Sequence, residues 1–395
     1  MTTRLELTLT APAGGNASVG RDESGRAVFA DGGLPGETVV VELNTEKKRF
    51  ARGTVVDVLD ASPARREPAC DTARQGCGGC DLAHATLDLQ QSMKRRVVRD
   101  ALTRIARIEH PPEIGLVSTA DARYRTTLRA AVRDGRAGYR RRASHDVILA
   151  DECLVAHPLA EEVLTGGRWG DASEVVIRVS ASTGERLAIV DGSGEGVEVP
   201  EGTIVATSDE LAAGADVYLT EDAAGRAWRV SAESFFQAGP AAASALVASV
   251  SRLVGNVEGL DVVDAYSGIG LFAGTVGVGA RSIVAIESSP TSTADARENL
   301  AGMNALVMEE RVEHWTPIPA DIVIADPART GLGDEGVDVL AACAASRFVL
   351  VSCDTGSLGR DIGLLVGRGY RLDAVEIVDA FPDTSHVETV VALSR

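Results

Sequence analysis

The sequence predicts an α/β fold: a doubly wound, Rossmann-like domain at the C-terminal end, preceded by an OB-like β-barrel and a central β-rich region. From about residue 240, helical segments alternate with short buried strands, a pattern typical of a parallel sheet. The first 60 or so residues contain about five short alternating strands, which favours a small closed barrel. Residues between about 123 and 230 are rich in strands. We therefore expect domains at 1–62, 63–232 and 233–395.

The N-terminal strands are predicted from alternating or β-branched runs that are separated by glycine-containing turns. These runs occur at 5–9, 27–30, 38–43 and 50–59. A proline-rich linker begins at Ser62, and a cysteine-containing segment follows it. Apolar residues then recur at helical spacing over 86–109, and Pro111 and Pro112 end the predicted helix.

The later elements are predicted in the same way. Central strands are expected at 128–133, 175–179, 187–190 and 227–230, with a helix over 159–166. The C-terminal domain should begin with a helix over 241–254. Its strands are expected at 261–266, 282–287, 321–326, 347–353 and 370–377.

Charge is unevenly distributed along the chain. The net charge is −18, which taken alone argues against a nucleic-acid partner. Eight arginines nevertheless fall between Arg123 and Arg142, opposed there only by Asp134, and a second basic stretch runs from Lys94 to Arg107. A local basic patch is what binding to a phosphate backbone requires. The alternative interpretation is a solvated charged face.

The chain has no run of 18 apolar residues, and its first residues lack the apolar segment of a secretory signal. We therefore expect a cytoplasmic protein with no membrane contact. In a reducing compartment the six cysteines are not expected to form structural disulfides.

A nucleoside-bearing cofactor is predicted at the end of the first C-terminal strand. Asp264 is followed there by Gly268 and Gly270, and glycines let the backbone approach a ligand closely. Glu287 ends the next strand, where an acid can bind ribose hydroxyls. NAD and S-adenosylmethionine both fit this pair, and Asp326-Pro327 at the end of the third strand favours a methyltransferase.

Cys353 and Glu388 are the candidate catalytic pair. Carbon 5 of uracil is a poor nucleophile, but addition of a thiolate at C6 creates an enolate that can attack a methyl sulfonium. A base must then remove the C5 proton before the thiolate leaves. Cys353 ends the fourth strand and suits the first role, and Glu388 suits the second. The alternatives are a buried cysteine in the core and a solvated glutamate.

Four other cysteines, Cys70, Cys77, Cys80 and Cys153, form a candidate metal site. Four thiolates could hold a [4Fe–4S] cluster or a zinc ion. Four ligands would close the site, which favours a structural role. Cys343 fits no such pattern and is expected in a helical core.

With these motifs the chain resembles the RNA uracil-C5 methyltransferases, in the subgroup with a TRAM domain and an iron–sulfur cluster. The resemblance spans nearly the whole chain. It rests on Leu34-Pro-Gly-Glu37 in the barrel, Cys77-Gly-Gly-Cys80, Ser352-Cys353-Asp354 and Phe381-Pro-Asp-Thr-Ser-His-Val-Glu388. The last two motifs are highly specific in combination.

The resemblance implies a reaction and its site residues. The enzyme would use S-adenosylmethionine to make 5-methyluridine through a covalent adduct of Cys353, with Glu388 as base. Cofactor contacts carry over to Gln237, Tyr266, Glu287 and Asp326. Leu271 stands where many members have asparagine, so the cofactor contact made by that asparagine does not carry over to this chain.

The resemblance also favours the [4Fe–4S] cluster over zinc. It favours 23S ribosomal RNA as substrate over transfer RNA. We expect a monomer, since no additional interface segment stands out.

The sequence leaves two alternative functions to compare with this one. An RNA cytosine-C5 methyltransferase would use a second catalytic cysteine, and it would leave Glu388 unexplained. A non-catalytic RNA-binding iron–sulfur protein would have no need for Cys353 together with Glu388.

Overall fold

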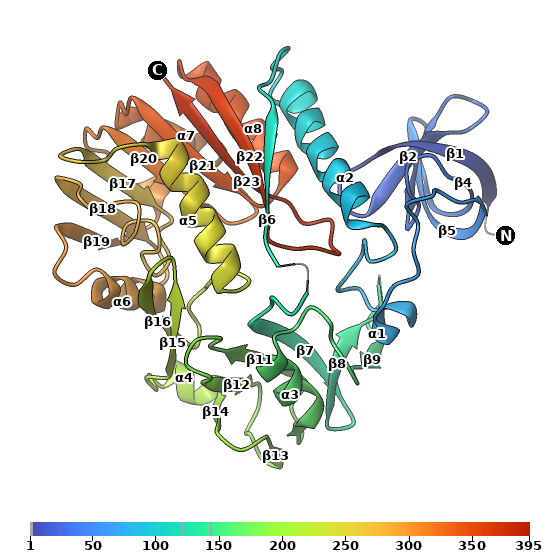
Figure 1. Cartoon of the computed structure of the whole chain (residues 1–395), viewed down its shortest axis with the longest axis horizontal. Helices are drawn as coiled ribbons and strands as arrows, with labels where there is room; N and C mark the ends of the chain where they lie inside the picture. The colour runs from blue at the N-terminus through green and yellow to red at the C-terminus, as the bar shows by residue number, and fades with distance from the viewer. Residues whose placement is uncertain (1–2, 121, 143) are drawn as a thin grey trace.

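The N-terminal part is the expected β-barrel, which the computed structural model places beside helix α2 (Figure 1). The structure describes residues 3–120, 122–142 and 144–395. Hydrogen bonds close the barrel in the order β1-β2-β3-β5-β4. Its strands are β1 (Arg4–Pro12), β2 (Ala17–Arg21), β3 (Ala27–Asp31), β4 (Thr38–Glu46) and β5 (Phe50–Asp60). Alternation places Leu9, Val28 and Val39 in a fully buried core.

The segment after the barrel connects it to the rest of the molecule. It contains the short helix α1 (Asp71–Arg74), then α2 (Leu87–Asp100), whose last turn continues as the π-helix η1 (Ala101–Ile105). The helix predicted over 86–109 therefore ends earlier, at Ile105. The chain then enters β6 (Ile114–Ser118), which pairs in parallel with β22 of the C-terminal domain. The sequence patterns did not indicate this addition to the C-terminal sheet.

The central region is built on a six-stranded sheet of order β14-β12-β11-β7-β8-β9. Its strands are β7 (Thr127–Arg133), β8 (Arg136–Arg140), β9 (Val147–Leu149), β11 (Glu174–Val179), β12 (Arg186–Val190) and β14 (Thr203–Thr207). Helix α3 (Pro158–Gly166) packs on it through Val163 and Leu164, beside the buried Trp169. The smaller elements are β10 (Arg168–Trp169), β13 (Val197–Glu198), α4 (Ser208–Ala212), and the hairpin of β15 (Tyr218–Ala223) and β16 (Arg226–Ser231).

The C-terminal domain is the predicted doubly wound fold. Its eight-stranded sheet has the order β19-β18-β17-β20-β21-β23-β22-β6. The strands are β17 (Asp261–Ala265), β18 (Ser282–Glu287), β19 (Ala305–Glu309), β20 (Ile322–Ala325), β21 (Arg347–Ser352), β22 (Arg371–Asp379) and β23 (Glu388–Ser394). Strands β17 to β21 are parallel, whereas β23 runs antiparallel to both of its neighbours. Because β18 and β20 lie on opposite sides of β17, a crevice opens at the carboxyl ends of these strands.

Helices cover both faces of this sheet. The helices are α5 (Pro240–Val254), α6 (Pro290–Asn299), α7 (Gly333–Ala342) and α8 (Thr355–Gly367), with the 3-10 turn η2 (Val312–His314). Leu246 and Val250 of α5 pack on one face, and Leu340 of α7 and Ile362 of α8 pack on the other. In the ranges that the structure describes, no helix is long and apolar enough to cross a membrane.

Candidate active site

A cavity of about 640 Å³ opens at the carboxyl edge of the C-terminal sheet. The side chains predicted to bind cofactor or act in catalysis all line it. They are Gln237, Tyr266, Glu287, Asp326, Cys353 and Glu388. They converge because β17, β18, β20 and β21 are parallel and end at the same edge, while β23 begins there.

The loop after β17 lines the part of the cavity that contains most of the predicted cofactor residues. Gly268 and Gly270 have φ values of +53° and +86°, a conformation that favours glycine. Tyr266 shares it, with φ of +59°, and its hydroxyl donates to Glu313 Oε1 at 2.9 Å. Glu287 accepts hydrogen bonds from the backbone N–H groups of Gly268 and Ser289, at 3.0 and 2.7 Å. The Glu287 carboxylate is thus fixed against the loop.

Two buried polar atoms, one at the end of β17 and one in the loop after it, have no protein partner within the described residues. They are Oδ1 of Asp264 and Oγ of Ser267. Burial raises the pKa of Asp264 to about 7, and its other oxygen accepts from the N–H of Ala273. Buried polar groups are normally hydrogen-bonded, so the Ser267 hydroxyl, which lines the cavity, is suited to a polar ligand. Leu271, in contrast, adds an apolar side chain to the wall.

Gln237 is held by residues that the sequence motifs did not indicate. Its loop begins after β16 and includes Phe235 and Phe236, which also line the cavity. The buried guanidinium of Arg178, from the central sheet, donates to three backbone carbonyls just before it, at Ser231, Ala232 and Ser234. The buried Asp295 of α6 accepts from the Ser234 hydroxyl at 2.6 Å.

The catalytic half of the cavity lies on three neighbouring strands. Asp326 follows β20, Cys353 follows β21 and Glu388 begins β23, where Thr389 pairs with Ser352. The two predicted catalytic side chains therefore lie on adjacent strands, although 35 residues separate them in sequence (388 − 353).

Burial and neighbouring negative charges raise the pKa values of these groups. Burial raises the pKa of Cys353 to about 11, with a further increase from the carboxylates of Glu388 and Asp326. Burial and Asp326 raise the pKa of Glu388 to about 8, and burial raises that of Asp326 to about 7. Only Arg329 acts in the opposite direction on both Cys353 and Glu388.

Arg329 and His386 are further side chains of the cavity. Arg329 Nη2 lies 3.3 Å from His386 Nδ1. Because a guanidinium can only donate, Nδ1 must accept, which assigns the neutral imidazole with its proton on Nε2. Burial, followed by the charge of Arg329, lowers the pKa of His386. Arg329 follows the Asp326-Pro327 motif in sequence. That motif is the sequence feature from which Arg329 could have been predicted as a site residue.

A second cavity, of about 450 Å³, lies among the four predicted ligand cysteines, Cys70, Cys77, Cys80 and Cys153. Cys153 Sγ accepts from the Tyr139 hydroxyl at 3.5 Å, and Cys77 Sγ accepts from the N–H of Gly79 at 3.4 Å. Burial raises the pKa of Cys80 to about 12. Among the described residues, no three Cys, His, Asp or Glu side chains are grouped so that they could hold a metal ion. Cys343 is fully buried at the end of α7.

The predicted basic surface is only partly available to a partner. Arg123, Arg129 and Arg136 form ion pairs with neighbouring carboxylates. Arg140, Arg141 and Arg142 line a hollow of about 720 Å³ beside Gly78 and Gly79. These two glycines belong to residues 70–82, called here the cysteine segment. In the second basic stretch, the prediction was wrong for Lys94. Its side chain is 2% exposed and pairs with the buried Asp379.

Comparisons with known proteins agree with this fold. The TRAM domain family matches residues 3–56. An uncharacterized RNA methyltransferase of Streptomyces avermitilis is 31% identical over 98% of this chain and 97% of its own length. Another, from Streptomyces coelicolor, is 33% identical over 96% of this chain and 90% of its own length.

A solved structure has the same overall fold. It is the Pyrococcus abyssi tRNA (uracil-54, C5)-methyltransferase in complex with S-adenosyl-L-homocysteine. It superposes with a TM-score of 0.76 at 22% identity, covering 98% of this chain and all of that one. The doubly wound domain, its cavity and the TRAM barrel thus define a methyltransferase with an RNA-directed module. Given relatives above 30% identity along almost its entire length, the chain belongs to the RNA methyltransferase family.

Proposed function

We propose that this enzyme methylates carbon 5 of a uridine in RNA, with S-adenosylmethionine as methyl donor and Cys353 as nucleophile. The observation that carries the proposal is the position of Cys353 and Glu388 on adjacent strands, in one cavity with the cofactor residues. A nucleophile and a base on the same side of a pyrimidine ring suit addition followed by elimination. The RNA cytosine-C5 alternative would leave Glu388 without a role.

In the proposed reaction, the Cys353 thiolate forms a bond to C6 and the ring electrons move to the C4 oxygen as an enolate. Arg329 favours the thiolate, since its charge opposes the groups that raise the thiol pKa. The cofactor supplies an electrophilic methyl group, which C5 attacks. Glu388 then takes the C5 proton, the C6–S bond breaks and the double bond between C5 and C6 returns.

The cofactor half of the cavity fits such a donor. Glu287 is suited to the ribose hydroxyls, and Gln237, Tyr266 and Asp326 would surround the remainder of the molecule. The Ser267 hydroxyl, which lines the cavity, would provide donor and acceptor capacity there. Leu271 would contribute an apolar contact where relatives of the resembled subgroup carry asparagine.

We further propose 23S ribosomal RNA, rather than transfer RNA, as the substrate of a cytoplasmic, monomeric enzyme. The TRAM barrel (1–62) and the central domain (63–232) would bind RNA, and the C-terminal domain (233–395) would carry out catalysis. Support for RNA contact comes from the hollow lined by Arg140, Arg141 and Arg142. The ribosomal preference rests on the resemblance of the motifs.

The test is covalent trapping with RNA that contains 5-fluorouridine. Fluorine cannot leave C5 as a proton does, so the Cys353 adduct should accumulate in the presence of S-adenosylmethionine. We expect a complex stable to denaturing electrophoresis with 23S ribosomal RNA fragments and not with transfer RNA transcripts. Trapping on transfer RNA alone would reverse the choice of substrate. Trapping on neither, with an enzyme that binds cofactor, would contradict the uracil mechanism.

For the four cysteines we propose a [4Fe–4S] cluster rather than zinc. A single zinc ion binds thiolates at about 2.3 Å, which would bring the sulfurs to within about 4 Å of one another. The cysteines instead surround a cavity, which suits a larger iron–sulfur core. Hydrogen bonds to the sulfurs of Cys77 and Cys153 would stabilise their thiolate forms.

Anaerobically prepared protein should therefore be brown and contain iron and sulfide. The Cys80→Ser variant should lose most of this iron, because a thiolate ligand is removed. The matched control is Cys343→Ser, which changes a buried cysteine outside the cavity and should keep the iron content. A colourless wild-type protein with one equivalent of zinc would overturn the assignment.

A further inference from the structure

The connection between β22 and β23, residues 380–387, separates the two cavities of the molecule. Phe381 and His386 line the catalytic cavity, whereas Pro382 and Asp383 line the cavity of the four cysteines. This connection, called here the partition loop, also leads directly into Glu388, the proposed base. Its conformation therefore affects both sites.

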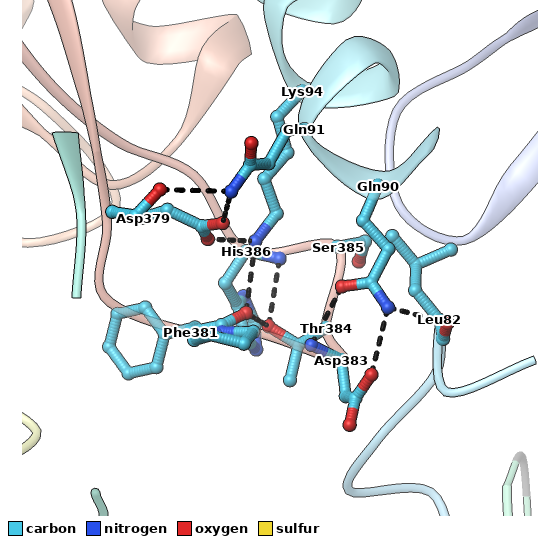
Figure 2. Close-up of polar contacts among 12 residues, drawn as sticks. Leu82, Gln90, Gln91, Lys94, Asp379, Phe381, Asp383, Thr384, Ser385 and His386 are labelled. Atoms are coloured by element: carbon cyan, nitrogen blue, oxygen red, sulfur yellow. Dashed lines mark hydrogen bonds and ion pairs between the residues drawn. The ribbon is translucent and has the colours of Figure 1, made fainter. Parts of the chain in front are cut away.

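Residues from the N-terminal half of the chain hold the partition loop. Gln90 donates to Asp383 Oδ1 and accepts from the Asp383 N–H, both at 2.8 Å (Figure 2). Lys94 pairs with Asp379 at 2.6 Å and donates to the Phe381 carbonyl at 2.9 Å (Figure 2). The Gln90 and Lys94 side chains are buried, so the loop has well-defined polar partners.

Asp81 makes the loop contact that lies closest in sequence to the cysteine site, because it directly follows Cys80. Its carboxylate accepts from both the N–H and the hydroxyl of Ser385, at 2.7 and 2.6 Å. The neighbouring Leu82 N–H donates to the Asp383 carbonyl at 2.9 Å. The end of the cysteine segment thus contacts the partition loop directly.

The other end of this series of contacts lies in the catalytic cavity, which Arg329 and Cys353 both line. His386 follows Ser385, and its Nδ1 accepts from Arg329. The ring of Phe381 packs edge-on against His386 at 5.7 Å between centroids. Arg329 is the positive group that favours the charged forms of Cys353 and Glu388, whereas Asp326, at the end of β20, acts on both as an opposing charge.

We propose that Asp81 is a positioning residue for the catalytic cavity: it holds Ser385, which fixes His386 and so keeps Arg329 beside Cys353. The position of the cysteine segment thereby determines the reactivity of the Cys353 thiol. This inference rests on the proposed role of Cys353 as nucleophile. Hydrogen bonds would thus connect the cysteine segment to catalysis without any electron transfer.

The variants Asp81→Ala and Asp81→Asn test it. Alanine removes both acceptors, whereas asparagine can accept from the Ser385 N–H and donate to its hydroxyl. Asp88→Ala, at an exposed acid in the first turn of α2, is the matched control. The readout is the rate at which iodoacetamide alkylates Cys353 at increasing pH, followed by mass spectrometry of its peptide. This measurement uses the full-length protein and requires neither RNA nor turnover.

With alanine, the pH at which Cys353 becomes reactive should rise, while Asp81→Asn and Asp88→Ala should match the wild type. The kcat for methylation should fall roughly tenfold to a hundredfold with the Kd for S-adenosylmethionine unchanged, as expected when a catalytic group is displaced. An unshifted profile for Asp81→Ala would overturn the proposal. A wild-type enzyme that neither methylates nor traps RNA would count against the proposed function instead, because alkylation is measured independently.

Ser385→Ala is the second variant, to be used if Asp81→Ala folds poorly. It removes only the hydroxyl donor and should give a smaller shift in the same direction. Its effect should not add to that of Asp81→Ala, because both changes break one interaction. An additive effect, or no shift for Ser385→Ala, would contradict the proposed path.

Discussion

Cys353→Ala is expected to lower methyl transfer by at least about 10⁴-fold, because Cys353 is the one cysteine among the described residues that line the cavity. Without the adduct, C5 of uracil is too weak a nucleophile to attack the methyl donor. Cofactor affinity should be unchanged, since the polar atoms assigned to the cofactor come from other residues of the cavity. The measurements are transfer of labelled methyl groups to RNA and calorimetric binding of S-adenosylmethionine.

The control for this variant is Cys343→Ala, which removes a thiol that lies outside both cavities. It should retain methyl transfer at the wild-type level at temperatures where it stays folded. Turnover by Cys353→Ala close to that of the wild type would exclude the covalent mechanism. Loss of cofactor binding in that variant would instead indicate that the cavity had collapsed.

Glu388→Gln is expected to stop the reaction one step later. The amide has nearly the same shape as the carboxyl group but cannot take the C5 proton. Turnover should fall by about 10²- to 10⁴-fold, the usual contribution of a positioned base. The methylated RNA should remain attached to Cys353, so a covalent complex should accumulate with ordinary uridine. Denaturing electrophoresis with labelled methyl groups measures it. Rapid release of methylated RNA would exclude Glu388 as the base.

The pH dependence of this step follows from the environment of Glu388. Burial and Asp326 raise its pKa to about 8, so the carboxylate required as base becomes populated as the pH rises through that value. In single-turnover experiments, release of the product should therefore accelerate with increasing pH in the wild type. The Glu388→Gln variant should lose this dependence. An identical pH profile in both proteins would contradict the assignment.

The sequence alone predicted the fold class, and it predicted that the principal site residues lie at one edge of a sheet. This succeeded because parallel strands place their carboxyl ends side by side, so motifs at strand ends converge whatever the length of the intervening helices. Asp264, Glu287, Asp326 and Cys353 all follow this rule. Glu388 was assigned from its motif, and its strand runs in the opposite direction.

Tertiary structure alone determined what surrounds these residues. Lys94 was grouped with solvent-exposed arginines because of its neighbours in sequence, yet it is buried against Asp379, 285 residues away. Asp81 and Ser385 are separated by 304 residues, and β6 joins a sheet whose other strands all lie after residue 260. Such contacts leave no periodic or local signal. They arise only when folding brings distant segments together and each buried polar group must find a partner.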